Sequence, residues 1–129
     1  MSRLRLYVGV RWFWSDRSGT LDIDADVDGV PVTEGKRFPT PAARKAPDAF
    51  VVELAPGRHR LRARSGSQGA RFEVEFDMTE NPAFAQLCYD HYPKDHPSYE
   101  QYRRFDPAST SGHREGFTFE IRDRDFGWR

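Results

Sequence analysis

A run of alternating arginines in the middle of the chain constrains the fold more than any other feature. Residues Arg58 to Arg64 have arginine at every second position, with His59, Leu61 and Ala63 between them. Alternate side chains point to opposite sides of a β-strand, so the pattern predicts a strand with one basic face. Neighbouring charges on that face lie about 7 Å apart and repel by roughly 0.6 kcal/mol per pair even in water. The strand therefore needs acidic neighbours or an anionic partner.

Two other stretches carry acidic side chains in the matching pattern. Residues 21–28 alternate apolar side chains with four aspartates, and residues 71–77 are mostly acidic at the positions that would face outward. Opposite charges on neighbouring strands attract across a sheet. We expect the arginine strand to pair with at least one acidic stretch, with a position between both as an open alternative. The apolar side chains on the other face would form half of a sandwich core.

Length and composition limit the class of protein. The 129 residues carry 20 basic and 20 acidic side chains, so the net charge is zero. A chain of this length can bury one core without a metal, and its single cysteine, Cys88, excludes an internal disulfide and fits a reducing compartment. Balanced charge argues against nucleic acid as the partner. The first residues alternate without the apolar core of a signal peptide, so we expect none, and no apolar run approaches about 20 residues. We therefore expect one cytoplasmic domain over residues 1–129 that makes no membrane contact.

Alternating apolar residues predict further strands around the arginine strand. They cover residues 3–14, 49–54 and 116–122. The Ala-Pro-Gly turn at 55–57 predicts a hairpin between strand 49–54 and the arginine strand. Sequential hairpins of this kind predict antiparallel pairing throughout.

Prolines mark the places where the strand pattern stops. Pro31 predicts an edge strand, because proline cannot donate a hydrogen bond to a neighbouring strand. Pro39, Pro41 and Pro47 predict a long irregular loop over residues 33–48. A loop of this length in a small domain is either functional or mobile.

The region 79–115 follows another pattern. Asn81 and Pro82 form a favourable helix start. Four side chains downstream recur at the spacing of one helical face, namely Phe84, Leu87, Cys88 and His91. A second short helix is predicted over residues 97–105. The predicted fold is thus all-β, an antiparallel β-sandwich of about seven strands with one or two short helices inserted before the last strand.

Two turns resemble those of a known family. The bend at Asp28-Gly29 and the Leu-Ala-Pro-Gly-Arg-His-Arg-Leu stretch at 54–61 resemble the "DG" bend and "L-x-P-G-x-H-x-L" hairpin of PEGA-type repeats, small β-sandwich modules. The resemblance covers residues 21–77, apart from the inserted loop, and does not extend beyond Met78. It implies a PEGA-like or immunoglobulin-like interaction module without catalytic residues, of a kind that is often extracellular.

Aromatic and arginine side chains indicate where a partner would bind. A regular strand cannot bury three consecutive aromatic residues on one side, so some of this surface faces a partner or is covered by Phe126 and Trp128. Tyrosines and arginines of the kind found at recognition surfaces gather in 79–115. The alternative interpretation is that half of them simply cover the sheet. The candidate partner-binding residues are Trp12, Phe13, Trp14, Tyr92, Tyr99, Tyr102, Arg103 and Arg104.

A calcium loop is one candidate metal site. Asp24, Asp26, Asp28 and Gly29 match the opening of such a loop, in which alternating carboxylates converge after a glycine turn. The closing glutamate is missing, because the position that requires it is Gly35. An outward strand face neutralised by arginine is the preferred interpretation.

A zinc site is the second candidate. Thiolate and imidazole are ligands that zinc prefers, and residues three apart share a face of a helix. The candidate ligands are Cys88, His91, His96 and His113. A nucleophilic pair of Cys88 and His91, oriented by Asp90 or Asp95, lacks an oxyanion hole, and burial of Cys88 as a small apolar residue is the simpler interpretation.

No catalytic fingerprint is present, and the glycine turn at 66–69 is not a phosphate-binding loop. We expect a non-catalytic protein-interaction or assembly module without a cofactor, which binds a partner protein or a second copy of itself. The first or last strand could add to a partner's sheet edge. One alternative is a small zinc-dependent enzyme or zinc-stabilised domain centred on Cys88, His91 and His96. Another is a carbohydrate- or nucleotide-binding module that stacks its ligand on Tyr99 or Tyr102.

Overall fold

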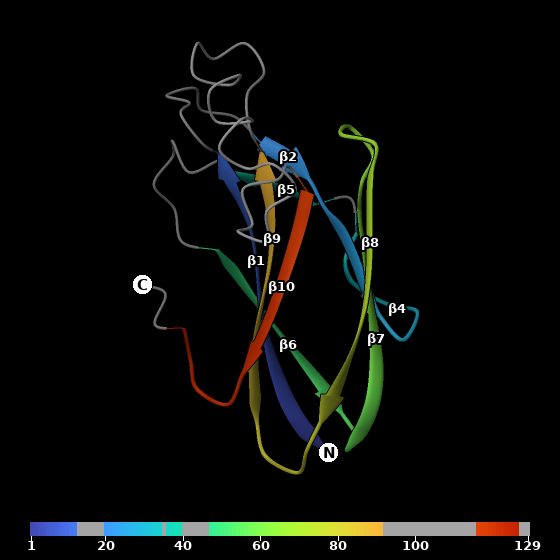
Figure 1. The fold of residues 1–129 in the computed structure, drawn as a ribbon, viewed down its shortest axis with the longest axis vertical. Coiled ribbons are helices and arrows are strands. Elements are labelled where there is room, and N and C mark those ends of the chain that lie inside the picture. The colour runs from blue at the N-terminus through green and yellow to red at the C-terminus, as the bar shows by residue number, and fades with distance from the viewer. Residues whose placement is uncertain (13–19, 35, 40–46, 92–115, 127–129) are drawn as a thin grey trace, which may run out of the picture.

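The structure is a computed structural model that describes residues 1–12, 20–34, 36–39, 47–91 and 116–126. These residues form ten strands in three sheets and contain no helix. The strands are β1 (Ser2–Trp12), β2 (Thr20–Asp22), β3 (Asp24–Val27), β4 (Val30–Thr33), β5 (Arg37–Pro39), β6 (Asp48–Leu54), β7 (Gly57–Ser65), β8 (Ala70–Met78), β9 (Ala83–His91) and β10 (Gly116–Arg122) (Figure 1). The all-β class is confirmed for the described part of the chain.

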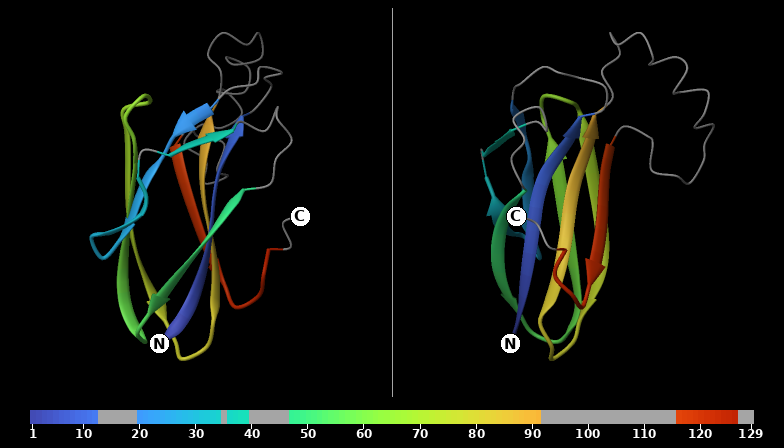
Figure 2. Two further views of the ribbon diagram at one scale, coloured as in Figure 1. Left: turned by 180° about the vertical axis from the view of Figure 1, so that it is seen from behind. Right: turned by 90° about the vertical axis from the view of Figure 1, so that its left-hand side faces the viewer.

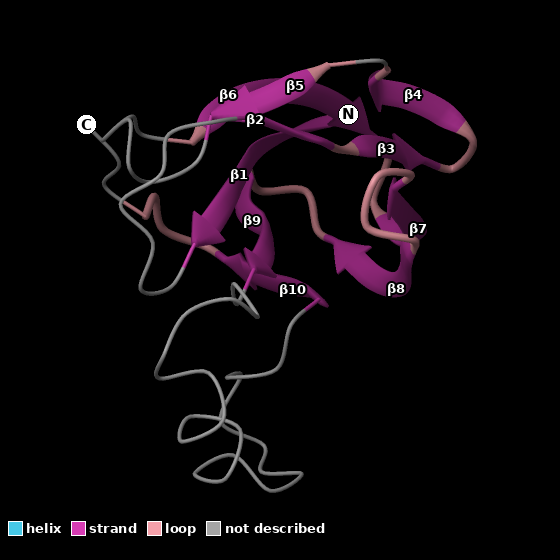
Figure 3. Ribbon diagram, turned by 90° about the horizontal axis from the view of Figure 1, so that it is seen from above, coloured by secondary structure: helices cyan, strands magenta, loops and turns pink. Residues whose placement is uncertain are grey.

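The strands divide into two four-stranded sheets and one small sheet. Sheet I has the order β10-β9-β1-β6, sheet II has the order β4-β3-β7-β8, and β2 pairs with β5. Sheets I and II run along the long axis of the molecule (Figure 2). Seen from above, their strands surround a common interior (Figure 3).

The arginine strand β7 lies between the two acidic stretches. It pairs antiparallel with β3, which places Arg62 opposite Asp26 and Arg64 opposite Asp24. It also pairs antiparallel with β8, whose outward positions are mostly acidic. The predicted charge pairing is confirmed, in the form in which β7 has an acidic neighbour on each side.

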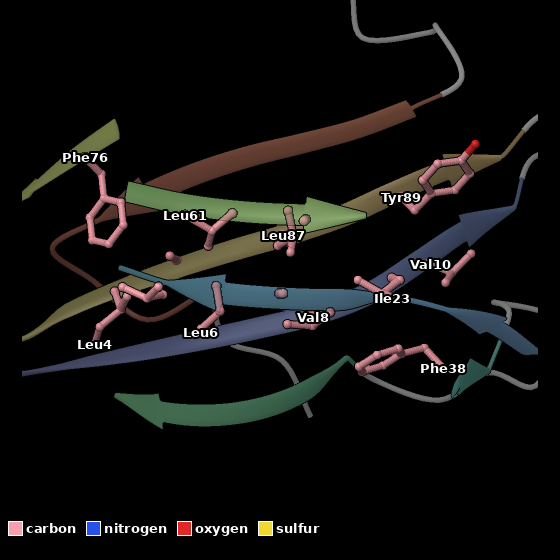
Figure 4. Close-up of a cluster of buried hydrophobic side chains, with 14 of the residues drawn as sticks. Leu4, Leu6, Val8, Val10, Ile23, Phe38, Leu61, Phe76, Leu87 and Tyr89 are labelled. Atoms are coloured by element: carbon pink, nitrogen blue, oxygen red, sulfur yellow. The ribbon is translucent and has the colours of Figure 1, made fainter. Parts of the chain in front are cut away.

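A single cluster of buried apolar side chains joins sheets I and II (Figure 4). Its members from sheet I include Leu4, Leu6, Val8, Val10, Ala85, Leu87 and Tyr89, and those from sheet II include Ala25, Val27, Leu61, Ala63 and Phe76. They occupy alternate positions of their strands, which face one side of a sheet. Burial of each large apolar side chain contributes about 1.5–3 kcal/mol. This burial holds the two sheets together.

Residues 83–91 form strand β9, so the helix predicted from Asn81 is wrong. Besides the helical spacing, this segment carries a period-two set, Ala85, Leu87 and Tyr89, which enters the core. β9 also has a hydrogen-bonded strand on each side, β1 and β10. Alternation and two strand partners therefore outweigh the local helix start. Because β9 runs parallel to β1, the prediction of antiparallel pairing throughout is wrong as well.

The predicted hairpin between β6 and β7 is also wrong. β6 pairs antiparallel with β1 in sheet I, and the turn after Leu54 carries the chain across to sheet II. The physical reason lies in the charges. β6 carries one outward acid, Glu53, which could not neutralise four arginines, whereas β3 and β8 together can. β7 therefore pairs with the two acidic strands and not with β6, which precedes it in sequence.

Other strand predictions are confirmed or corrected in detail. The strands predicted over 3–14 and 116–122 correspond to β1 and β10, although β1 is a central strand and offers no free edge. The acidic stretch 21–28 divides at Ile23 into β2 and β3, and the loop predicted over 33–48 is interrupted by β5. The edge position of β4, which contains proline, is confirmed. The helix predicted over 97–105 lies outside the described residues.

Candidate functional site

The outer face of sheet II carries the charged side chains of three adjacent strands. Ion pairs join Arg58 to Glu75 (3.2 Å) and Asp77 (3.4 Å), Arg60 to Glu73 (3.0 Å) and Glu75 (3.1 Å), Arg62 to Asp26 (3.4 Å), and Arg64 to Asp24 (3.5 Å). Each arginine side chain is at least half exposed, so a single pair contributes no more than about 1 kcal/mol. Together the pairs neutralise the face and hold its side chains across the strands.

This face is hollowed at the end nearer the β7–β8 turn. The hollow has a volume of about 800 Å³ and is lined by residues of β3, β4, β7 and β8 and by Glu34, which follows β4. Its charged lining comprises Asp24, Asp26, Glu34, Glu73, Arg62, Arg64 and Arg71. A smaller hollow of about 400 Å³ shares Arg62 with it and continues toward Asp28 and His59. We call the larger one the sheet II hollow.

The charge pattern is broken at one position inside the sheet II hollow. Along the β7–β8 pair, Arg60 lies opposite Glu75 and Arg62 opposite Glu73, but Arg64 lies opposite Arg71. Side chains directly opposite one another have Cβ atoms about 5 Å apart, and like charges at that distance are destabilising. No described residue forms an ion pair or a hydrogen bond with the Arg71 side chain. The end of the hollow therefore holds two arginines whose only carboxylate partner among the described residues is Asp24, on Arg64.

The turn beside this arginine pair is anchored by Asp22. Its carboxylate accepts a hydrogen bond from the backbone N–H of Gly66 (2.8 Å) and from the hydroxyl groups of Ser65 (3.3 Å) and Ser67. These bonds, chiefly that from the Ser67 hydroxyl, lower the pKa of Asp22 below its ordinary value. The anchored turn fixes the register at which Arg64 faces Arg71.

At the other end of sheet II, His59 connects two turns. Its Nδ1 lies 2.5 Å from Oδ2 of Asp28, and its Nε2 lies 2.7 Å from the carbonyl oxygen of Ala55. Both contacts are acceptors, so the protonated ring, in which both nitrogens donate, can satisfy both of them. The hydrogen bond to Asp28 raises the pKa of His59 and lowers that of Asp28. Asp28 and Gly29 have positive φ of 53° and 80°, as a tight hairpin turn between β3 and β4 requires.

The outer face of sheet I differs, because other segments cover the part of it around Tyr7 and Gly9, whereas Arg3 and Glu53 stay exposed. The hydroxyl of Tyr7 donates a 2.6 Å hydrogen bond to Asp125, and the ring of Phe126 packs edge-on against Tyr7. Burial, together with this hydrogen bond, raises the pKa of Tyr7. Further along β1, Pro47 lies so close to Gly9 that a Cβ atom there would be 3.2 Å from it. Phe126 thus contacts Tyr7, whereas its predicted contact with Trp12, Phe13 and Trp14 falls outside the side chains that the structure describes.

Most of the predicted partner-binding residues lie outside the described part of the chain. Trp12 is the last residue of β1. The others are Phe13, Trp14, Tyr92, Tyr99, Tyr102, Arg103 and Arg104, and with Trp128 they lie outside the described residues. The partner-binding prediction for these residues stays a prediction.

The metal-site predictions rested on local geometry that the structure lacks. Asp24 and Asp26 are ion-paired with arginines and Asp28 with His59, as the neutralised strand face predicts. Cys88 is buried on strand β9, where a three-residue spacing does not place two residues on one face as a helix would. His96 and His113 lie outside the described residues. Among the residues that are described, no three His, Cys, Asp or Glu side chains gather as a metal site would require.

Sequence reasoning missed the sheet II hollow and the opposition of Arg64 and Arg71. The signal was the length of the glycine turn. A four-residue loop closed by Ser65 and Ala70 fixes the register of the whole β7–β8 hairpin and brings the two arginines face to face. Counting outward from the turn would have found this exception.

Comparison with family models, with curated proteins and with solved structures found no match. Over the described ranges, the structure contains no helix long and apolar enough to cross a membrane.

Proposed function

We propose that this chain is a non-catalytic binding module, and that it docks a partner protein on the outer face of sheet II. We propose further that its architecture is a β-sandwich of PEGA-like or immunoglobulin-like type. Two four-stranded sheets that share one apolar cluster support this architecture, and so does a chain that crosses from sheet I to sheet II after β6. The module would use its rigid sheet as a platform for recognition.

The observation that carries the binding proposal is the sheet II hollow. A concave surface lets a partner bury more area per residue than a flat sheet does. Paired charges around it give a patterned electrostatic surface, which contributes to specificity and to the rate of association. Glu34 and Arg71, both exposed and both in the lining, have no ion-pair partner among the described residues and add charges of opposite sign that a partner could match.

The edges of sheet II are less suited to binding than its face. β4 is short and contains Pro31, which interrupts the row of edge donors. β8 carries Glu73, Glu75 and Asp77 at its outward positions, and charged edge strands resist pairing with another chain. We therefore place the partner over the face and not alongside a strand.

Site-specific crosslinking tests this proposal. A photo-reactive phenylalanine analogue at Glu34 should crosslink a discrete protein in a lysate of the native host, and an excess of unmodified protein should compete for it. The matched control carries the analogue at Arg124, which is exposed beyond β10. A product that links two copies of the chain would identify the partner as a second copy. Equal labelling from both positions, or none from position 34, would contradict docking at the hollow.

A further inference from the structure

We propose that the Arg64–Arg71 end of the sheet II hollow binds carboxylate side chains of an acidic segment in the partner protein. This inference rests on the proposed function and names the chemistry of its partner. It starts from the one like-charged opposition on the β7–β8 pair. At Arg58, Arg60 and Arg62 the hairpin places an acid opposite each arginine. Arg64 is therefore the only arginine of β7 that lacks an acid opposite it on β8.

The cost of that opposition is borne by the folded protein alone and disappears when an anion binds. Like charges directly opposite in a sheet destabilise it. A carboxylate placed between the two guanidinium groups would replace this repulsion with charge-assisted hydrogen bonds, which are among the stronger polar interactions. Binding of a carboxylate would thus remove the repulsion between the two arginines that destabilises the free protein at this position.

Both guanidinium groups are accessible to such a ligand. The side chain of Arg64 is 70% exposed and meets Asp24 at 3.5 Å through its Nε atom. Arg71 is exposed and has no described ion-pair partner. The planar fork of arginine suits two parallel hydrogen bonds to one carboxylate. Side chains on adjacent strands are close enough for both arginines to contact the same group.

The surrounding acids favour a peptide over a polyphosphate. Asp24, Asp26, Glu34 and Glu73 line the same hollow, so it holds four carboxylates and three arginines. A nucleic acid carries one negative charge per about 1.7 Å of duplex and would meet these acids along its length. A protein segment can place a carboxylate at the arginine end and present polar or basic side chains to Glu34 and Glu73. Charge complementarity therefore selects a peptide whose acidic residues are spaced apart.

A titration with a defined probe tests the inference. The probe is a fluorescein-labelled serine-rich peptide with glutamate at every fourth position, so that its acidic residues are spaced apart. The same peptide with lysine at those positions is the charge-reversed probe. Fluorescence anisotropy should show binding of the glutamate peptide that weakens with added salt, because exposed charges are screened. Arg71→Glu should weaken it at least about tenfold, since a charge-assisted contact is replaced by a repulsion. Arg124→Glu makes the same change of charge away from the hollow and should leave the affinity within about twofold.

A thermal melt of each variant shows whether it is folded. Arg71→Glu should melt slightly above the wild type, because it places an acid opposite Arg64. Arg71→Gln provides a second variant that removes the charge without reversing it. Failure of the wild type to bind the glutamate peptide would overturn the inference. An equal loss in Arg124→Glu, or tighter binding of an oligouridylate of the same charge, would overturn it too. If crosslinking from position 34 still succeeds in those cases, the proposed function stands and only the acidic partner is wrong.

Discussion

The outer faces of the two four-stranded sheets have the same alternating pattern in sequence, but part of the sheet I face is buried under other segments. On sheet II the outward arginines and acids are paired with each other and stay exposed. On sheet I the outward Tyr7 and Cys88 are buried, with Phe126 packed on Tyr7 and Pro47 against the neighbouring Gly9. Alternation tells which side of a strand a residue takes, but not whether a distant segment covers that side. The buried part of the sheet I face contributes to stability, whereas the sheet II face stays exposed and is the one that we propose for recognition.

Replacing Tyr7 and Arg60 by alanine, one at a time, is the strongest test of this difference between the two faces. Both lie at outward positions of central strands, but Tyr7 is buried and Arg60 is about half exposed. Tyr7→Ala should cost about 3 kcal/mol of unfolding free energy, as expected when a buried aromatic ring is lost. Arg60→Ala should cost about 1 kcal/mol or less, because its ion pairs are exposed. Urea unfolding of both variants gives the two values, and equal costs would show that the outer faces do not differ.

The dependence of stability on pH sharpens the comparison at the His59 end of sheet II. The folded pKa of His59 lies above 6.5, so its contribution is complete below pH 6.5 and is lost as pH rises through the folded pKa. The folded pKa of Asp28 lies below 3.8, so its contribution is present above pH 3.8 and is lost as pH falls through the folded pKa. The pair should thus stabilise the protein most between pH 3.8 and pH 6.5.

We expect the free energy of unfolding to fall between pH 6 and pH 9 by about 1 kcal/mol, a value that allows for solvent around the half-exposed Asp28. The matched control is Asp28→Asn, because asparagine tolerates the positive φ of this turn. Urea unfolding at both pH values should show a flatter dependence in this variant. The same slope in the variant and the wild type would mean that other groups cause the pH effect.

The smallest expected effect is a gain in stability. Arg71→Glu replaces the like-charged opposition with an opposite-charged pair across β7 and β8, and should stabilise the protein by about 0.2–1 kcal/mol. The melting temperature should rise, and the rise should shrink in high salt because both side chains are exposed. An unchanged or lower melting temperature would mean that Arg64 and Arg71 do not repel each other in the folded protein.

Charge patterning predicted the centre of sheet II because the signal was long-range and physically strict. Four alternating arginines required at least one acidic neighbour, and β3 and β8 supply one on each side. Local signals were weaker guides. The favourable helix start at Asn81 lost to the alternation of Ala85, Leu87 and Tyr89, and the turn after Leu54 changed sheets instead of closing a hairpin. The hollow arises from the twist and register of four strands together, which no single stretch of sequence specifies.

The position of β1 has a consequence for the growing polypeptide on the ribosome. Its two neighbours are β6 and the parallel β9, so β1 emerges first and waits for residues 48–54 and then for residues 83–91. During that interval Leu4, Leu6 and Val8 have no partner, and pairings between residues so distant in sequence form slowly. Until β9 has been synthesised, this apolar strand has an unpaired edge, and unpaired apolar strands of this kind are prone to aggregate.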